Sequence, residues 1–209
     1  MLSVVCNMDF ILKGEFQHIC DTPLSIIKPQ CDLADDLSYL LEDDAFFDVT
    51  IHVGGESFRA HKNILSARSD VFRAMFAHKC RESTTNVVHL EDTTADVWKE
   101  VLKFLYTARF SPLGTTDVGD VLKVADKYNL SSLKTVCTHH LAKQINVDNL
   151  EQMLLLSYMH KADFLKTACM NYMKHSAHKI VVKPEWEELM QQFPDLTSEA
   201  LVSVVKRMP

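Results

Sequence analysis

The sequence predicts an α+β fold in which a small sheet flanked by helices is followed by an all-helical extension. Residues 48–60 alternate polar and apolar side chains around a Gly-Gly pair, a pattern typical of a β-hairpin. From residue 97 onward, apolar residues instead recur at spacings of three and four, as they do in helices with one buried face. A short sheet followed by a long helical stretch defines this fold class.

The expected hairpin has its first strand at residues 49–53, where the valine and isoleucine side chains share one face. β-Branched residues of this kind favour strands. Gly54-Gly55 then supplies the positive φ angles that a tight turn needs, and the return strand carries Phe58 and Ala60 on the inner face. An isolated hairpin is only marginally stable in water, so neighbouring helices must cover its apolar face.

Two short helices are expected directly after the hairpin. The first begins near His61, and Ser69 or Asp70 can cap the second. The apolar stripe of the second helix consists of Val71, Phe72, Met75 and Phe76. A stripe with this spacing is typical of a helix that covers an apolar surface.

The other expected elements follow from the same two periodicities. A helix over residues 33–41 precedes the hairpin, and a third strand at 87–90 follows it. Further helices are expected at 97–105, 118–125, 130–141, 150–159, 164–173, 184–193 and 198–206. Near the start of the chain, apolar residues at every second position from Leu2 to Phe10 predict a strand.

The composition is that of an ordinary globular protein, with 47% apolar and 24% charged residues in a chain of 209. The net charge of −6 argues against nucleic acid as a partner, because phosphate binding needs a basic surface. No apolar run approaches the about 20 residues of a membrane span, so no membrane partner is expected. The N-terminus lacks a basic segment followed by an apolar one, so we expect an intracellular protein of the nucleus or cytoplasm.

Six cysteines are scattered along the chain without a C-x-x-C pair, and reduced thiols are expected. His78 and Cys80 lie two residues apart, as do Cys137 and His139, but no nucleophile motif surrounds either cysteine. Structural zinc needs four ligands at characteristic spacing, and Cys137 instead lies on an apolar helix stripe. We therefore expect no catalytic residue, metal or cofactor; a cysteine-dependent enzyme is the alternative from another class.

Several spaced motifs carry a resemblance to a known family. They are Phe47-Asp48-Val49, Phe58-Arg59-Ala60-His61-Lys62, Leu65-Ser66-Ala67-Arg68-Ser69, Phe72-Arg73-Ala74-Met75-Phe76, Phe104-Leu105-Tyr106-Thr107, Ala125-Asp126-Lys127-Tyr128, Leu130 and Leu133. In this order and separation they resemble the BTB/POZ domain. From about Cys31 to the C-terminus the chain is similar to MATH-BTB proteins of the speckle-type POZ protein kind. The resemblance implies a BTB/POZ fold followed by an all-α 3-box/BACK-like extension.

The same resemblance implies a division of the chain into three segments. Residues 1–30 would hold the last strand of an almost entirely missing MATH domain and a linker. Residues 31–145 would form the BTB/POZ domain, and residues 146–209 a 3-box and a partial BACK region. Leu201 stands where the speckle-type POZ protein has an aromatic residue, so assembly beyond a dimer is not expected.

The leucines of the 33–41 helix leave two alternatives open. Such a helix can pack on the core of its own chain, or on a second copy of the chain, as the resemblance implies. In the second case the dimer interface consists of Leu33, Leu37, Leu40, Leu41, Asp48, Lys62 and Ile64. Asp48 and Lys62 would form a charged pocket there; the alternative is an ion pair at the surface. His61 is expected to be a hydrogen-bonded structural histidine.

Residues 76–83 resemble the loop by which this family grips the N-terminal helices of cullin-3. That loop has a hydrophobic residue, any residue and a glutamate, and here the triplet is Cys80-Arg81-Glu82. The expected cullin-binding residues are Met75, Phe76, Cys80, Arg81, Glu82 and Tyr128. Tyr106 fits either this surface or the core, and the alternative for the whole segment is a solvated charged loop.

The function that the resemblance implies is that of a substrate adaptor in a cullin-3 RING ubiquitin ligase. The chain would act as a BTB homodimer that binds cullin and presents an unidentified client for ubiquitination. The alternative is a non-catalytic regulatory protein that pairs with full-length MATH-BTB paralogues and modulates their ligase activity. Both functions rest on binding other proteins rather than on catalysis.

Overall fold

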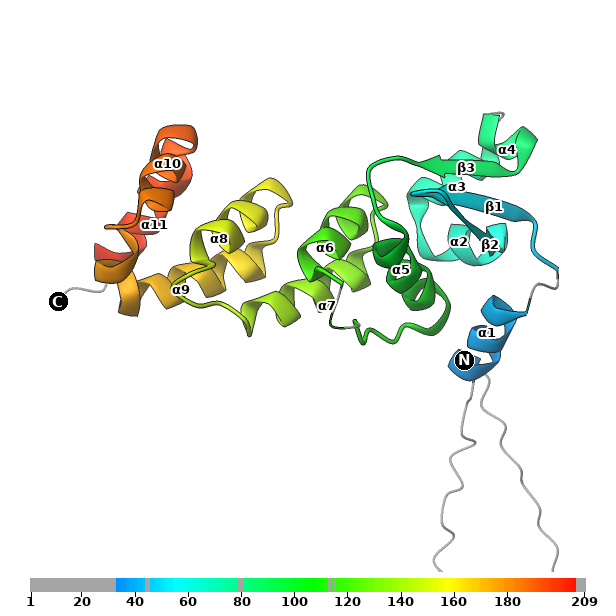
Figure 1. Ribbon diagram of the computed structural model, residues 1–209, viewed down its shortest axis with the longest axis horizontal. Helices are drawn as coiled ribbons and strands as arrows, with labels where there is room; N and C mark the ends of the chain where they lie inside the picture. Colours follow the sequence, from blue (N-terminus) through cyan, green and yellow to red (C-terminus); the bar gives the residue numbers. More distant parts are fainter. Residues whose placement is uncertain (1–32, 44–45, 79–80, 113, 115, 206–209) are drawn as a thin grey trace, which may run out of the picture. The chain divides into compact units, whose positions relative to one another are not determined.

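The computed structural model describes residues 33–205, with the exception of 44–45, 79–80, 113 and 115. The strand expected at 2–10 and the whole expected segment 1–30 lie outside the described residues. Within the described part, a small sheet with its helices is followed by a helical stretch (Figure 1). The predicted α+β fold class is therefore confirmed.

The sheet has three strands in the order β2-β1-β3. Strands β1 (Val49–Val53) and β2 (Glu56–Ala60) form the expected antiparallel hairpin, and the turn glycines have positive φ angles of 57° and 89°. Strand β3 (Val87–Leu90) was expected as a strand, but its direction was not predicted: it runs parallel to β1. A parallel neighbour requires a crossover connection, which the helices between β2 and β3 supply.

Three helices form this crossover: α2 (Lys62–Arg68), α3 (Asp70–Ala77) and α4 (Arg81–Thr85). Of the two possible caps for α3, the structure selects Ser69. Its Oγ accepts a hydrogen bond from the backbone N–H of Phe72 at 3.2 Å and donates one to the carbonyl oxygen of Tyr128 at 2.6 Å. Ser69 therefore both starts α3 and ties it to the end of α6 (Val118–Lys127).

The second half of the chain is helical, as predicted. Its elements are α5 (Ala95–Thr107), α6, α7 (Ser131–Ala142), α8 (Leu150–Met159), α9 (Asp163–Ile180), α10 (Pro184–Gln192) and α11 (Pro194–Val205). Two boundaries differ from expectation: α9 extends to Ile180, beyond the expected end at 173, and α11 begins at Pro194 rather than at 198. Proline is favoured in the first helical turn, where its missing N–H leaves no hydrogen bond unmade, so Pro194 can start a helix as Pro184 does.

The buried faces of the sheet and the helices form one hydrophobic cluster among the described residues. Its fully buried members include Ile51 of β1, Phe72 of α3 and Trp98 of α5, and it continues to Trp186 of α10. Contacts run in succession from α5 to α6, from α6 to α7 and from α7 to α9. The helical stretch is thus packed onto the sheet-containing part through α6 and α7. None of the helices in the described part of the chain is long and apolar enough to cross a bilayer.

Candidate protein-interaction surfaces

Helix α1 (Leu33–Glu42) contains no buried residue, although four of its ten residues are leucines. Leu37 and Leu41 are partly buried and pack against the core, and α5 is the helix that α1 contacts. Leu40 is also partly buried but does not pack against the core, and Leu33 is 57% exposed. The four leucines share one stripe of the helix, at spacings of three and four. Leu37 and Leu41 pack inward, whereas Leu33 and Leu40 keep surface that the core does not cover, and we call this uncovered surface the outer face of α1. Both alternatives expected for the helix are therefore compatible with the structure.

The expected charged pair takes an arrangement that the sequence did not predict. Oδ1 of Asp48 accepts a hydrogen bond from the backbone N–H of Lys62 at 2.7 Å, at the start of α2. The ammonium group of Lys62 donates instead to Oδ1 of Asn86 and lies 5.4 Å from the centre of the Phe76 ring. Among the described residues no ion pair joins the two side chains. The Asp48 carboxylate satisfies a free helix amide, while the lysine charge lies beside α3.

Ile64, the last of the expected interface residues, lies on α2. It is partly buried and packs against the core. The core of the same chain therefore covers part of the Ile64 side chain. Only the part that remains exposed is available to a second polypeptide.

Met75 and Phe76 lie on α3, are both partly buried and both pack against the core. An aromatic stack supports Phe76: its ring centre lies 6.0 Å from that of Phe72, and the Phe72 ring centre lies 4.8 Å from that of Tyr128 with an interplanar angle of 3°. Tyr128 is only 3% exposed. It was expected as part of the surface, but the structure places it beneath, because its ring fills the space against Phe72. Burial raises the pKa of the Tyr128 hydroxyl.

The segment 76–83 was compared with a loop, but the structure forms the short helix α4 from Arg81. Glu82 lies in its first turn, where a negative charge interacts favourably with the free amides of the helix, and it is partly buried. Arg81 is exposed, and Cys80 lies outside the described residues. Helix α4 contacts α3, so Glu82 and the side chains of Met75 and Phe76 come from neighbouring helices.

His61 and Tyr106 are both buried, and the structure confirms that His61 is a hydrogen-bonded structural histidine. The Tyr106 hydroxyl accepts a hydrogen bond from the backbone N–H of His61 at 2.9 Å and lies 2.8 Å from its Nδ1. Of the two positions open for Tyr106, the core is therefore correct. Burial, the largest influence, raises the pKa of Tyr106 to about 12.

Cys137 and His139 do not form a nucleophile with its base. Cys137 is fully buried, as its position on an apolar stripe predicted, and burial raises the pKa of its thiol to about 12. A thiol that stays protonated is a poor nucleophile and a poor metal ligand. His139 is exposed, its Nδ1 lies 2.8 Å from the carbonyl oxygen of Thr135, and its ring stacks on Phe164 at 3.9 Å. Three or more potential metal ligands do not gather anywhere in the part of the chain that the structure describes.

The structure also shows a pocket that sequence reasoning missed. It lies between α6 and α8, has a volume of about 320 Å³, and combines apolar side chains with polar ones. Met153, Leu156 and Met159 supply apolar surface, while Lys123 and His160 are polar members of the lining. Residues from two helices that are distant in sequence form this pocket, so no local pattern could have revealed it.

Asp126, next to this pocket, joins three helices. Its carboxylate accepts a hydrogen bond from Nζ of Lys134 on α7 at 2.6 Å and lies 3.0 Å from Nδ1 of His160, at the end of α8. Burial alone would raise the pKa of Asp126, but the hydrogen bonds and charges of these two partners outweigh burial and lower it. The cluster therefore connects α8, and with it the helical extension, to α6 and α7.

Comparison with known proteins places this geometry among interaction domains. A family model described as the BTB/POZ domain matches residues 37–145. The TD and POZ domain-containing protein 1 of Mus musculus is 37% identical over 204 residues, which cover 97% of this chain and 56% of that protein. The TD and POZ domain-containing protein 5 of Mus musculus is 39% identical over 173 residues, covering 82% of this chain and 51% of that protein. This chain spans about half the length of the curated relatives it matches.

Among solved structures, the BTB domain of zebrafish PATZ1 is similar to this chain. It shares 25% sequence identity, covers 56% of this chain and 94% of its own length, and superposes with a TM-score of 0.47.

Proposed function

The chain belongs to the BTB/POZ domain family, and from this premise we propose that it is a substrate adaptor of a cullin-3 RING ubiquitin ligase that acts as a homodimer. The observation that carries the proposal is the surface formed by Met75, Phe76 and Glu82 on the neighbouring helices α3 and α4. We call these three residues the α3–α4 surface.

The α3–α4 surface has the features of a docking site for a helix. Met75 and Phe76 are held by the core yet retain accessible surface, and the Phe72–Tyr128 stack beneath them prevents Phe76 from turning inward. Binding energy at interfaces concentrates on a few such apolar anchors. Glu82 adds a hydrogen-bond acceptor at the edge, which gives orientation and specificity more than affinity.

The pocket between α6 and α8 would lengthen this surface along α6. Tyr128 follows the last residue of α6 and supports Phe72 of α3, whereas the pocket lies against the first part of the same helix. A pocket with flexible methionine side chains can adapt to apolar residues of a partner. We therefore include Met153 and Met159 in the proposed cullin contact.

The outer face of α1 supports the proposal of a dimer, since BTB domains commonly mediate homo- or heterodimerisation. Leu33 is 57% exposed, and Leu40 is partly buried without packing against the core of the described chain. Burial of a leucine side chain stabilises by roughly 1.5–3 kcal/mol, and a two-fold interface uses every such residue twice.

The proposed mechanism is one of proximity rather than of chemistry. The adaptor would hold cullin on one surface and a client on another, so that client and charged enzyme share one assembly. This raises their effective concentration and replaces a bimolecular encounter with a nearly unimolecular step. No residue of the chain is proposed to act as a catalyst or to hold a cofactor.

Titration calorimetry of the purified chain against the N-terminal domain of cullin-3 tests the proposal. We expect a Kd on the order of tens of micromolar or tighter. Replacing Glu82 by Ala should weaken binding about 5- to 50-fold, the range for a loss of about 1–2.3 kcal/mol. Glu56→Ala, at an exposed glutamate of β2, is the matched control and should leave the affinity unchanged. The absence of binding in the intact chain would remove the cullin proposal.

We also propose that the chain is of the MATH-BTB type with the domain division 1–30, 31–145 and 146–209, the last segment being a 3-box and partial BACK region. The similarity to the mouse TD and POZ domain-containing protein 1 covers 97% of this chain and extends on both sides of the matched residues 37–145, which supports further segments next to the BTB/POZ domain. Limited proteolysis should cut near residue 146, in the connection between α7 and α8. Early cleavage inside α2–α6 would contradict the division.

A regulatory protein that pairs with longer paralogues is a second candidate. The 37% identity to the mouse TD and POZ domain-containing protein 1 favours it, because a related chain would offer α1 a surface similar to its own. Co-expression with a full-length paralogue tests this candidate. Recovery mainly as a heterodimer, with little homodimer, would support it; a homodimer that ignores the paralogue would exclude it.

A further inference from the structure

Ser111 lies in the exposed connection between α5 and α6, directly before Pro112. The described residues of this connection form neither helix nor strand, and Ser111 is exposed. A proline restricts the residue before it to extended backbone conformations. Ser111 is thus an accessible hydroxyl in a locally extended Ser-Pro pair.

The side chains around Ser111 alternate between inside and outside. Phe110 is partly buried, packs against the core and meets the ring of His140 edge to face at 6.2 Å. Arg109 and Ser111 on either side of it are both exposed. In an extended segment, residues two apart point to the same side. The Ser111 hydroxyl therefore shares the outer side of the connection with the Arg109 guanidinium.

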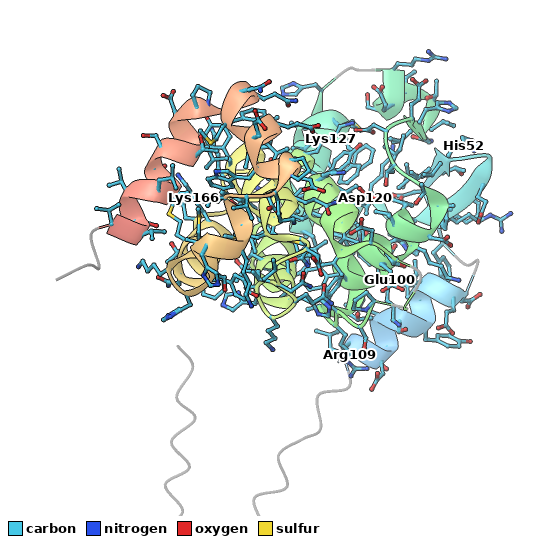
Figure 2. The ribbon with its side chains drawn as sticks, turned by 60° about the vertical axis from the view of Figure 1, so that its left-hand side comes forward. His52, Glu100, Arg109, Asp120, Lys127 and Lys166 are labelled. Atoms are coloured by element: carbon cyan, nitrogen blue, oxygen red, sulfur yellow. The ribbon has the colours of Figure 1, made fainter. Side chains whose placement is uncertain are left out.

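Arg109 links this connection to α1. Its Nη1 lies 2.5 Å from Oδ1 of Asp35 in the first turn of α1, and Figure 2 shows Arg109 beside that helix. Asp36 is a second carboxylate in the same turn. Because α1 has no buried residue, this ion pair contributes to holding the N-terminal end of the helix in place.

We propose that Ser111 is a phosphorylation site for a proline-directed protein kinase, and that the phosphate draws Arg109 away from Asp35 and loosens α1. In the reaction, Oγ of Ser111 forms a bond to the γ-phosphorus of ATP. The bond from that phosphorus to the β,γ-bridging oxygen breaks, ADP leaves, and the hydroxyl proton passes to the catalytic base of the kinase. The product is phosphoserine two residues from Arg109.

The charges around Arg109 determine the outcome. A phosphoserine carries close to two negative charges near neutral pH and offers three acceptor oxygens, so it competes well with a single carboxylate for a guanidinium. It also repels Asp35 and Asp36. The Arg109–Asp35 pair is exposed, and an exposed ion pair stabilises by only about 0.2–1 kcal/mol. Loss of the pair after phosphorylation should therefore let α1 open about two- to fivefold more often.

The first test is phosphorylation of the full chain by a cyclin-dependent kinase and by a mitogen-activated kinase, with the site mapped by mass spectrometry. Thr22-Pro23 is the other Ser/Thr-Pro pair of the chain, so both experiments use a Thr22→Ala background. We expect phosphate on Ser111, and its loss in Pro112→Ala, which keeps the hydroxyl but removes the recognised proline. No Ser111 phosphate from either kinase would overturn the proposal.

The second test is hydrogen exchange of the phosphorylated and unphosphorylated chains at equal concentration. Amides of α1 should exchange about two- to fivefold faster after phosphorylation, while β1 and α9 stay unchanged. Arg109→Ala should raise α1 exchange without phosphate, and phosphorylation should then add less. Equal α1 exchange in both states of the parent chain would refute the coupling. Neither test depends on cullin binding, so this inference and the proposed function can fail separately.

Discussion

The hydroxyl of Tyr106 accepts a hydrogen bond from the backbone N–H of His61 at 2.9 Å and lies 2.8 Å from Nδ1 of the same residue. The two residues are 45 positions apart, and their contact ties the end of the hairpin to α5. Both side chains are buried, so water cannot take the place of either hydrogen-bond partner if the other is removed.

Replacing Tyr106 by Phe should therefore lower the free energy of unfolding by about 1–3 kcal/mol, because the buried hydrogen bonds between the Tyr106 hydroxyl and His61 are lost. Chemical denaturation monitored by circular dichroism measures this loss. Tyr158→Phe is the matched control: Tyr158 is 43% exposed, and its hydroxyl remains in contact with solvent. A Tyr106→Phe protein as stable as the control would show that the contact contributes nothing to stability.

Stability should fall as the pH rises from about 9 to 12. Burial raises the pKa of Tyr106 and of the Cys137 and Cys169 thiols to about 12, from 10.0 for the tyrosine and 9.0 for the thiols. Above these ordinary values the unfolded chain loses protons that the folded chain keeps, so the equilibrium shifts toward unfolding. Urea denaturation midpoints at pH 8, 9, 10 and 11 measure the effect. The slope above pH 10 should be smaller in Tyr106→Phe, and a flat profile would contradict the burial of these groups.

The Asp126 cluster predicts a change of stability at the opposite end of the pH scale. The pKa of Asp126 is lowered in the folded chain. In acid, the Asp126 carboxylate therefore keeps its negative charge in the folded chain at pH values at which it is already protonated in the unfolded chain. The stabilisation is present above the ordinary value of 3.8 and is lost as the pH falls through the lowered value. Asp126→Asn should cost about 1 kcal/mol at pH 7, since the cluster is partly exposed.

Urea denaturation of wild type and Asp126→Asn at pH 7, 5 and 3 checks this expectation. The difference between the two proteins should shrink at the lowest pH. Asp120→Asn is the control, because Asp120 pairs with Lys123 three residues further along the same helix α6. A difference that stays constant with pH would show that Asp126 acts through packing rather than charge.

Leu40→Glu should convert the proposed dimer to a monomer without unfolding the chain. Leu40 lies on the outer face of α1 and does not pack against the core, so its loss leaves the fold intact, whereas a buried charge at a two-fold interface is unfavourable. Sedimentation velocity at matched concentrations measures the mass. Val182→Glu, at a valine that is 77% exposed on another part of the chain, is the control. Wild-type protein that sediments as a monomer would exclude the proposed interface.

The elements that the sequence predicted correctly are those whose signal is local. The β1–β2 hairpin follows from alternation around Gly54-Gly55, and Ser69 could be named as a cap because its hydroxyl acts on a residue three positions away. What the sequence could not predict depends on distant partners. The burial of Tyr128 requires Phe72, and the Asp126 cluster requires Lys134 and His160 from two other helices.

The family resemblance named interface positions but could not orient their side chains. Asp48 and Lys62 were expected to form a charged pocket at a dimer interface or an ion pair at the surface. Within the described chain Asp48 caps a backbone amide and Lys62 reaches Asn86, while the expected interface stays a prediction. Both arrangements use the same two residues at the same spacing. Only the placement of β3 next to β1, which brings Asn86 alongside, decides between them.

Gly119→Ala tests whether the pocket between α6 and α8 takes part in cullin binding. A Cβ at Gly119 would lie 3.1 Å from Oδ1 of Asp117 and 3.4 Å from Cδ2 of Leu156, both in the lining of the pocket. The first contact also disturbs the cap of α6, where Asp117 accepts a hydrogen bond from the Gly119 N–H at 2.7 Å. We expect a stability loss of about 1 kcal/mol from the cap and a several-fold weaker cullin affinity from the narrowed pocket.

Gly114→Ala is the matched control, because nothing lies within 4 Å of a Cβ at that position. Both variants are titrated against the N-terminal domain of cullin-3 at a temperature where each is fully folded, as judged by thermal denaturation. This separates a loss of affinity from a loss of fold. If Gly119→Ala binds as tightly as Gly114→Ala, the pocket lies outside the cullin contact, and the α3–α4 surface must account for binding without it.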